Sequence, residues 1–129
     1  VKVLTANKRE ERIRLSGIDA PEKAQPFGQV SKKHLSDQVF GQTVTVVWDK
    51  RDRYDRIVGR VMVNGTDANL GQITAGLAWH YKKYEDEQPA AERRQYAEAE
   101  SQARAAGLGL WRDRDPTPPW DWRKQKRSD

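Results

Sequence analysis

Residues 14–22 have the sequence RLSGIDAPE, and the surrounding fold can be worked out from them. A strand is predicted over 12–18, because polar and apolar residues alternate over 12–16 in the period-2 pattern of a half-buried β-strand. Gly17 interrupts the alternation, and a glycine with a change of phase predicts a β-bulge. Because a bulge exchanges the two faces of a strand, it would bring Asp19 onto the same face as Arg14.

The loop after this strand carries two carboxylates. Pro21 favours an extended backbone at Ala20, so the Ala20 carbonyl oxygen can turn toward a cation beside Asp19. Glu22 can approach the same region. Carboxylate and carbonyl oxygens are the ligands of hard cations such as Ca²⁺ and Mg²⁺. The commoner meaning of a short Asp-x-Pro-Glu segment is a polar turn with Asp19 as its cap, and the segment alone leaves both interpretations open.

Residues 49–56 form a block of charge that ends in Asp52-Arg53-Tyr54-Asp55-Arg56. A solvated hairpin loop is the usual meaning of such a block. The alternative is a phosphate-binding clamp, because the planar fork of a guanidinium matches phosphate oxygens. Arg56 directly precedes an apolar stretch at 57–63 that predicts a strand, so a sheet would anchor it.

Residues 79–84 have the sequence WHYKKY, in which aromatic side chains are interleaved with lysines. This pattern suits the stacking of nucleotide bases and contact with their backbone. Core packing is the alternative, and we favour it for Trp79. Tyr84 fits either interpretation, and we expect His80 to be structural.

The remaining pattern predicts a mixed α+β chain that is rich in β-structure. Further strands are predicted over 1–4, 43–48, 57–63 and 77–81, and helices over 27–40, 69–76 and 89–106. Asn64-Gly65 predicts a hairpin turn. Five short strands with about three helices fit an OB-fold, a five-stranded Greek-key barrel. The tail from Arg112 holds three prolines, two tryptophans and a basic end, and we expect its last residues to be disordered.

Length and composition set outer limits on the function. The chain has 129 residues, which suits one domain with a real core. Its 24 basic and 19 acidic residues give a net charge of +5, which fits a polyanionic partner or a merely basic surface. The absence of cysteine excludes disulfides and zinc–thiolate sites. No apolar run approaches the roughly 18 residues of a membrane span, so we expect no membrane partner. No feature of the sequence indicates an obligate oligomer, and we expect a monomer.

Taken together, these segments resemble the staphylococcal nuclease (thermonuclease) family and its bacterial relatives. The resemblance is carried by residues 14–22, 52–56, 76–78, 107–111 and 118–123. It extends from Val1 to about Arg123. It implies an OB-fold nuclease domain over 1–112 with a truncated first strand, followed by a basic tail with proline and tryptophan over 113–129.

The resemblance also implies catalytic roles. Arg14 and Arg56 would bind the scissile phosphate from two sides, and Arg56 would stabilise the leaving oxygen. Glu22 would act as general base on the attacking water. The family's enzymes depend on Ca²⁺, cut the P–O5′ bond of DNA and RNA, and leave 3′-phosphate ends. The family's habit favours export, so a secreted or periplasmic location is expected.

The implied metal ligands are Asp19, the backbone carbonyl of Ala20, and Glu22 through water. Family members often carry threonine at the position of Ala20, and a backbone ligand tolerates the change. The family also has an Asp-Gly-Asp-Thr segment whose last aspartate binds the metal, and residue 1 follows the place where it would stand. Lower cation affinity is therefore expected for these 129 residues. The implied substrate-binding residues are Arg53, Tyr54 and Tyr84.

Two classes of function remain in competition at this point. One is the nuclease. The other is a non-catalytic OB-fold module that binds nucleic acid, a class that usually lacks the acidic or arginine positions. The joint presence of Arg14, Asp19, Glu22 and Arg56 favours the enzyme, because a joint motif arises by chance far less often than each of its parts. A structural cation-binding domain would explain neither arginine.

Overall fold

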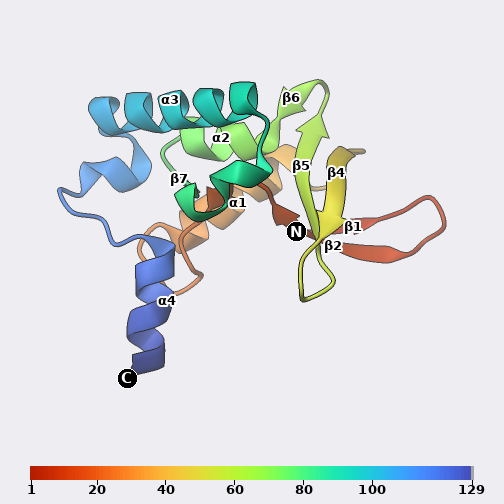
Figure 1. Ribbon diagram of the computed structural model, residues 1–129, viewed down its shortest axis with the longest axis horizontal. Coiled ribbons are helices and arrows are strands. Elements are labelled where there is room, and N and C mark those ends of the chain that lie inside the picture. The colour runs from red at the N-terminus through yellow and green to blue at the C-terminus, as the bar shows by residue number, and fades with distance from the viewer. Residues whose placement is uncertain (129) are drawn as a thin grey trace.

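The computed structural model describes residues 1–128, and it consists of a curled sheet with helices packed around it. Figure 1 shows α3 (Ala90–Ala106) lying above α2 (Ala68–Thr74), while α4 (Pro119–Ser128) projects from the body at the lower left. Helix α1 (Gly28–Val39) contacts α2. Within the described residues, no helix is both long enough and apolar enough to cross a bilayer.

The main sheet has five strands, and its two central strands run parallel. They are β1 (Lys2–Leu4), β2 (Glu10–Leu15), β4 (Thr45–Arg51), β5 (Ile57–Val63) and β6 (Thr66–Asp67). The order is β1-β2-β5-β4, and β6 pairs with β5. Only the β2–β5 pair is parallel, which requires the long crossover that contains α1. This α+β, OB-like arrangement confirms the predicted fold class.

The helices begin and end close to their predicted positions, but one strand prediction was wrong. The strand of 12–16 does not continue through a bulge at Gly17. It ends at Leu15, and Gly17 turns the chain at φ +78° into a short strand β3 (Ile18–Asp19). Strand β3 pairs with β7 (Trp79–His80) in a separate ladder. The left-handed backbone at Gly17 explains the difference, because it redirects the chain from one sheet to the other.

The charged segment 49–56 is only partly a loop. Strand β4 continues to Arg51, which pairs with Ile57, so the loop is confined to 52–56. Strand β4 lies at the edge of the sheet, where charged side chains can face water. Arg51 also bonds Glu11 on β2 at 3.0 Å (Nη1 to Oε2). The charged segment 49–56 therefore contains the exposed end of a strand as well as a loop.

The tail is also more ordered than the sequence predicts. Helix α4 occupies most of it, with Pro119 at its start, where a missing N–H costs nothing. Residue 129, at the predicted disordered end, lies outside the described residues. Two 3₁₀ turns complete the chain, η1 (Lys82–Glu87) and η2 (Gly109–Arg112). The Asn64-Gly65 turn joins β5 to β6 as predicted.

Two apolar clusters form the core on either side of α2. One gathers Ile13, Ile57, Val61, Val63 and Ala68 from the sheet and the start of α2. The other gathers Ile18, Ile73, Ala78 and Tyr96 between α2, α3 and the β3–β7 ladder. Because α2 contributes to both clusters, its position fixes how the main sheet meets the smaller ladder.

Asn69 on α2 ties the end of β2 to β5. Its side chain is fully buried, and its Nδ2 donates to the carbonyl oxygens of Ser16 at 3.0 Å and Gly59 at 3.1 Å. Its Oδ1 accepts from the Val61 N–H at 3.1 Å. These bonds hold the backbone just before the segment that carries Asp19.

We predict that Asn69→Ala lowers the free energy of unfolding by about 3 kcal/mol or more, because buried backbone partners lose their bonds at about 1–3 kcal/mol each. Urea unfolding followed by tryptophan fluorescence measures the change. Asn7→Ala, at an exposed turn, is the matched control. A loss below 1 kcal/mol would show that Asn69 does not hold the two strands together.

Candidate active site

One open hollow collects every residue that the sequence singled out for chemistry or substrate binding. Its volume is about 1090 Å³. Strand β2, the β3 segment, the 52–56 loop, η1 and α4 all contribute to its wall. The predicted site residues on this wall are Arg14, Asp19, Ala20, Glu22, Arg53, Tyr54, Arg56 and Tyr84. The remaining charged residues of the wall are mostly basic, which suits an anionic ligand.

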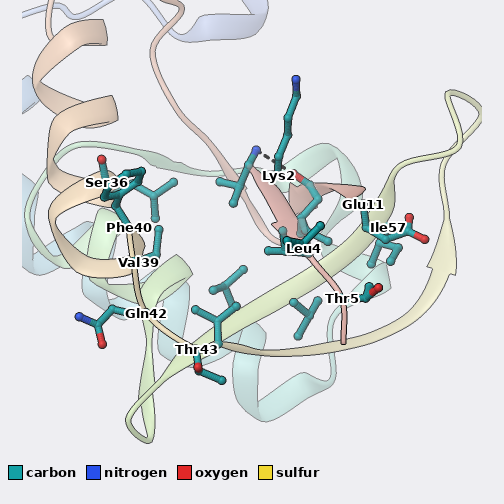
Figure 2. A pocket seen from close by; sticks show the side chains of 18 of the residues that line it. Lys2, Leu4, Thr5, Glu11, Ser36, Val39, Phe40, Gln42, Thr43 and Ile57 are labelled. Atoms are coloured by element: carbon teal, nitrogen blue, oxygen red, sulfur yellow. Dashed lines mark hydrogen bonds between the residues drawn. The ribbon is translucent and has the colours of Figure 1, made fainter. Parts of the chain in front are cut away.

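A second hollow, of about 880 Å³, lies between β1, α1 and β4. Figure 2 shows Leu4 from β1 and Val39 from α1 on opposite sides of it. Most of its lining side chains are apolar, and it contains none of the predicted site residues. The hollow with the arginines and carboxylates is therefore the candidate active site.

The parallel pairing of β2 and β5 brings Arg14 and Arg56 together. Arg14 is opposite Val58, and Arg56 lies two residues before Val58. Arg56 directly precedes β5, and both arginines approach Oδ2 of Asp52, so their guanidinium groups lie together at this end of the two strands. The structure thus unites two residues that are far apart in the sequence.

Asp52 holds this arginine pair, and the sequence analysis assigned it no role. Its Oδ2 lies 2.8 Å from Nε of Arg56 and 3.7 Å from Nε of Arg14. Its Oδ1 accepts the N–H groups of Tyr54 at 2.9 Å and Arg56 at 3.0 Å. An aspartate at the start of a short loop often accepts hydrogen bonds from backbone N–H groups a few residues further on, so its position in the loop could have predicted these bonds.

The environment of Asp52 favours its charged form. Burial acts to raise the pKa of Asp52, but the backbone N–H groups of Arg56 and Tyr54 and the Arg56 guanidinium outweigh it. The pKa of Asp52 is therefore lowered below its ordinary value. A charged Asp52 keeps the two guanidinium groups in place.

Aromatic rings stand beside both arginines. The Arg14 guanidinium carbon lies 5.0 Å from the centre of the Tyr84 ring, and Arg14 Nη2 lies 3.4 Å from Glu87 Oε2. The Tyr54 ring has Arg56 at 5.4 Å and Arg53 at 4.9 Å. Tyr54 is 56% exposed, so part of its ring is open to a ligand. These contacts place aromatic faces where a nucleotide base could stack.

The two carboxylates of the site converge on one guanidinium from α4. Arg123 Nη2 lies 2.7 Å from Asp19 Oδ2, and its Nη1 lies 3.1 Å from Asp19 Oδ1. The same Nη1 lies 2.6 Å from Glu22 Oε1. Sequence reasoning placed Arg123 in a tail motif but gave it no role, and its separation of 104 residues from Asp19 offered no local signal.

Burial and charge oppose each other at Asp19. Burial raises the pKa of Asp19 above its ordinary value, and the bonds from Arg123 only partly offset this. The hydrogen bond to Asp19, with a further one to Glu22, raises the pKa of Arg123, so its guanidinium stays charged. The carboxylates are thus held next to a permanent positive charge.

Asp19 and Glu22 fit a hard cation, because both already face a single cationic group. Among residues 1–128, no three His, Cys, Asp or Glu side chains gather as a metal-binding group. Backbone oxygen and water would therefore complete the ligand set, which is common for Ca²⁺ and Mg²⁺. Ala20 lines the same hollow.

Trp79 and His80 belong to the core, as the sequence analysis favoured. Trp79 is 6% exposed and meets Trp111 edge-on, with ring centres 4.6 Å apart. His80 is 1% exposed, and its Nε2 lies 2.9 Å from Gln88 Oε1. Neither side chain lines the candidate active site.

Comparison with known proteins gives consistent matches. Residues 12–113 match the family model described as "Staphylococcal nuclease homologue". An uncharacterized endonuclease of Haemophilus influenzae is 40% identical over 74% of this chain and 54% of its own length. A staphylococcal-like nuclease of Arabidopsis thaliana is 40% identical over 91% of this chain and 34% of its own length. The chain spans about a third to a half of these curated relatives.

We predict that Asp52→Asn lowers the free energy of unfolding by about 1–3 kcal/mol at neutral pH, because a charged hydrogen-bond acceptor is lost. The lowered pKa of Asp52 means that this stabilisation is present above the ordinary aspartate pKa, about 3.9, and is lost as the pH falls through the folded-state value. The difference from wild type should therefore shrink below about pH 4. Urea unfolding at several pH values measures it.

Asp55→Asn is the matched control, since Asp55 lies in the same loop with its side chain 83% exposed. It removes the same charge without touching the arginine pair. An equal effect of the two substitutions, or a difference that does not vary with pH, would contradict the role of Asp52.

Proposed function

The chain belongs to the staphylococcal nuclease family, and from this premise we propose that it is a cation-dependent nuclease that hydrolyses phosphodiester bonds in DNA and RNA. The observation that carries the proposal is the convergence of two arginines and two carboxylates in one hollow: Arg14, Arg56, Asp19 and Glu22. The finer proposal is that the cation is Ca²⁺ and that cleavage of the P–O5′ bond leaves 3′-phosphate ends.

The arginine pair supplies the positive side of the reaction. Hydrolysis of a phosphodiester places extra negative charge on the phosphoryl oxygens in the transition state. Arg14 lies on β2 and Arg56 directly precedes the adjacent strand β5, so both guanidinium groups can donate to one phosphate. Asp52 orients them before the substrate arrives, which reduces the reorganisation needed during the reaction.

The carboxylates supply the base and the cation ligands. Glu22, partly exposed on the wall of the hollow, would take the proton of the attacking water, because water at neutral pH is a poor nucleophile. Asp19 and the Ala20 carbonyl would bind the cation, with Glu22 contacting it through water. A bound cation would neutralise charge on the phosphoryl oxygens.

The aromatic wall supplies substrate contacts that are independent of sequence. Tyr54 and Tyr84 present rings beside Arg56 and Arg14, and Arg53 lies over Tyr54. Stacking needs a base that is free of its partner, so accessible single strands should be the better substrates. These residues would hold a nucleotide next to the phosphate that is cut.

We predict that the chain cuts denatured DNA in Ca²⁺ and loses this activity in excess chelator, because without the cation the two carboxylates would repel the phosphate and the arginine pair alone would face the phosphoryl charge. Gel electrophoresis follows the cleavage, and end-labelling of the products tests for 3′-phosphates. A folded chain that binds DNA without cutting it in any divalent cation would instead be a non-catalytic OB-fold binding module.

We predict that Glu22→Gln lowers turnover by about 10²–10⁴-fold, the usual contribution of a positioned base. Arg56→Lys keeps the charge but loses the planar fork, and should lower turnover by about 100-fold or more. Circular dichroism should show both variants folded. Glu98→Gln and Arg94→Lys, both exposed on α3, are matched controls that should retain full activity. Full activity of a site variant would refute the role of its residue.

A further inference from the structure

The start of α4 is anchored to the body beside the active site. Pro119 is fully buried. The Trp120 ring stacks on Tyr81, with centres 5.3 Å apart and planes 7° apart, and meets Trp79 edge-on at 5.4 Å. These contacts fix the first turn of the helix at the wall of the hollow.

A buried glutamine links the same segment to the catalytic loop. Gln25 is 6% exposed, and its Nε2 donates to the Thr117 carbonyl oxygen at 2.5 Å. Its Oε1 accepts the Glu22 N–H at 3.0 Å. One side chain therefore holds both the loop that carries Glu22 and the chain that leads into α4.

Arg123 follows Trp120 by three residues, so the anchored turn presents both side chains on one face of α4. Its guanidinium bonds both oxygens of Asp19 and one oxygen of Glu22, at 2.6–3.1 Å. It thus makes ion pairs with the two carboxylates that the proposed function assigns to a cation. Without a positive group, two carboxylates this close would repel each other.

We propose that Arg123 is the built-in counterion of Asp19 and Glu22, and that a divalent cation binds these carboxylates only by displacing it. The inference rests on the proposed function in one respect, namely that these carboxylates bind a cation. Guanidinium and cation require the same oxygens and carry the same sign of charge, so they compete. The apparent cation affinity then equals the intrinsic affinity multiplied by the fraction of molecules in which Arg123 is away.

Displacement requires little else to change. The Arg123 side chain is 36% exposed, and residues 124–126, which follow it in α4, are solvent-exposed. Figure 1 shows this part of the helix projecting from the body. Arg123 can therefore leave the carboxylates while Trp120 keeps the helix attached.

This competition predicts that Arg123 raises the stability of the cation-free chain and lowers the affinity for a cation. In the absence of a cation, Arg123 stabilises the fold by offsetting part of the negative charge of Asp19 and Glu22. In the presence of a cation, Arg123 opposes binding. An ion pair that only supported the fold would produce the first effect without the second, because cation affinity would not improve when it was removed.

Isothermal titration of the full chain with Ca²⁺ alone, without nucleic acid, tests the proposal. Arg123→Gln should lower the dissociation constant for Ca²⁺ about tenfold, the size expected for loss of a partly exposed charged pair. Arg123→Lys, which keeps the charge and loses the fork, should give an intermediate value. Lys126→Gln removes the same charge from an exposed position on the same helix and should leave the constant within about twofold.

Thermal unfolding gives a second measurement on the same proteins. In chelator, Arg123→Gln should melt below wild type, and saturating Ca²⁺ should narrow or reverse the difference because it stabilises the variant more. A melting temperature lowered equally with and without Ca²⁺ would indicate a merely structural ion pair and would overturn the proposal.

The outcomes separate this proposal from the proposed function. If Arg123→Gln binds Ca²⁺ no more tightly than wild type, and both cut DNA in Ca²⁺, the nuclease stands and the counterion role of Arg123 is refuted. If neither protein binds Ca²⁺ although both are folded, the carboxylates are not a Ca²⁺ site and both the counterion role and the calcium mechanism fall.

Discussion

The parallel pairing of β2 and β5 is the constraint on which the site depends. It brings Arg14 on β2 close to Arg56, which directly precedes β5, although 42 positions of sequence separate them. A parallel pair is not closed by a tight turn, so its register must be held by other contacts. Asn69 provides them, by bonding the backbone of both strands from a fully buried position. The buried side chain of Asn69 thus helps to align the strands that bring Arg14 and Arg56 together.

Each half of the site contains one residue of opposite charge. Asp52 offsets part of the positive charge of the two arginines, and Arg123 offsets part of the negative charge of the two carboxylates. In each half this residue has the charge of the ligand that the half would bind, a phosphate in the first and a cation in the second. Such pairing lowers the electrostatic free energy of holding like charges close together in the folded chain. A phosphate would therefore replace Asp52 as the partner of the arginines, and a cation would replace Arg123 as the partner of the carboxylates.

Local chemistry was predictable from the sequence, and long-range pairing was not. The motif residues around Asp19 and Arg56 do meet in one hollow, because turn and strand signals are carried by neighbouring residues. The predicted bulge at Gly17 was wrong, since a glycine can either bulge a strand or end it, and the choice depends on the distant partner β7. The roles of Asp52 and Arg123 could not be predicted for the same reason. Their roles exist only through contacts with other segments, and a charge in a loop or tail usually faces water.

The two halves also differ in where their residues come from. The matched family span of 12–113 contains both arginines, both carboxylates and Asp52, whereas Arg123 lies beyond it in α4. The arginine half is therefore complete within that span, but the carboxylate half obtains its counterion from the following segment. Asp19 is largely buried, so without Arg123 its charge would face Glu22 without the two guanidinium bonds that now offset it. Repulsion of this kind favours any external cation that can replace the guanidinium. On the proposed function, the affinity of the two carboxylates for a cation therefore depends on α4 as well as on the carboxylates themselves.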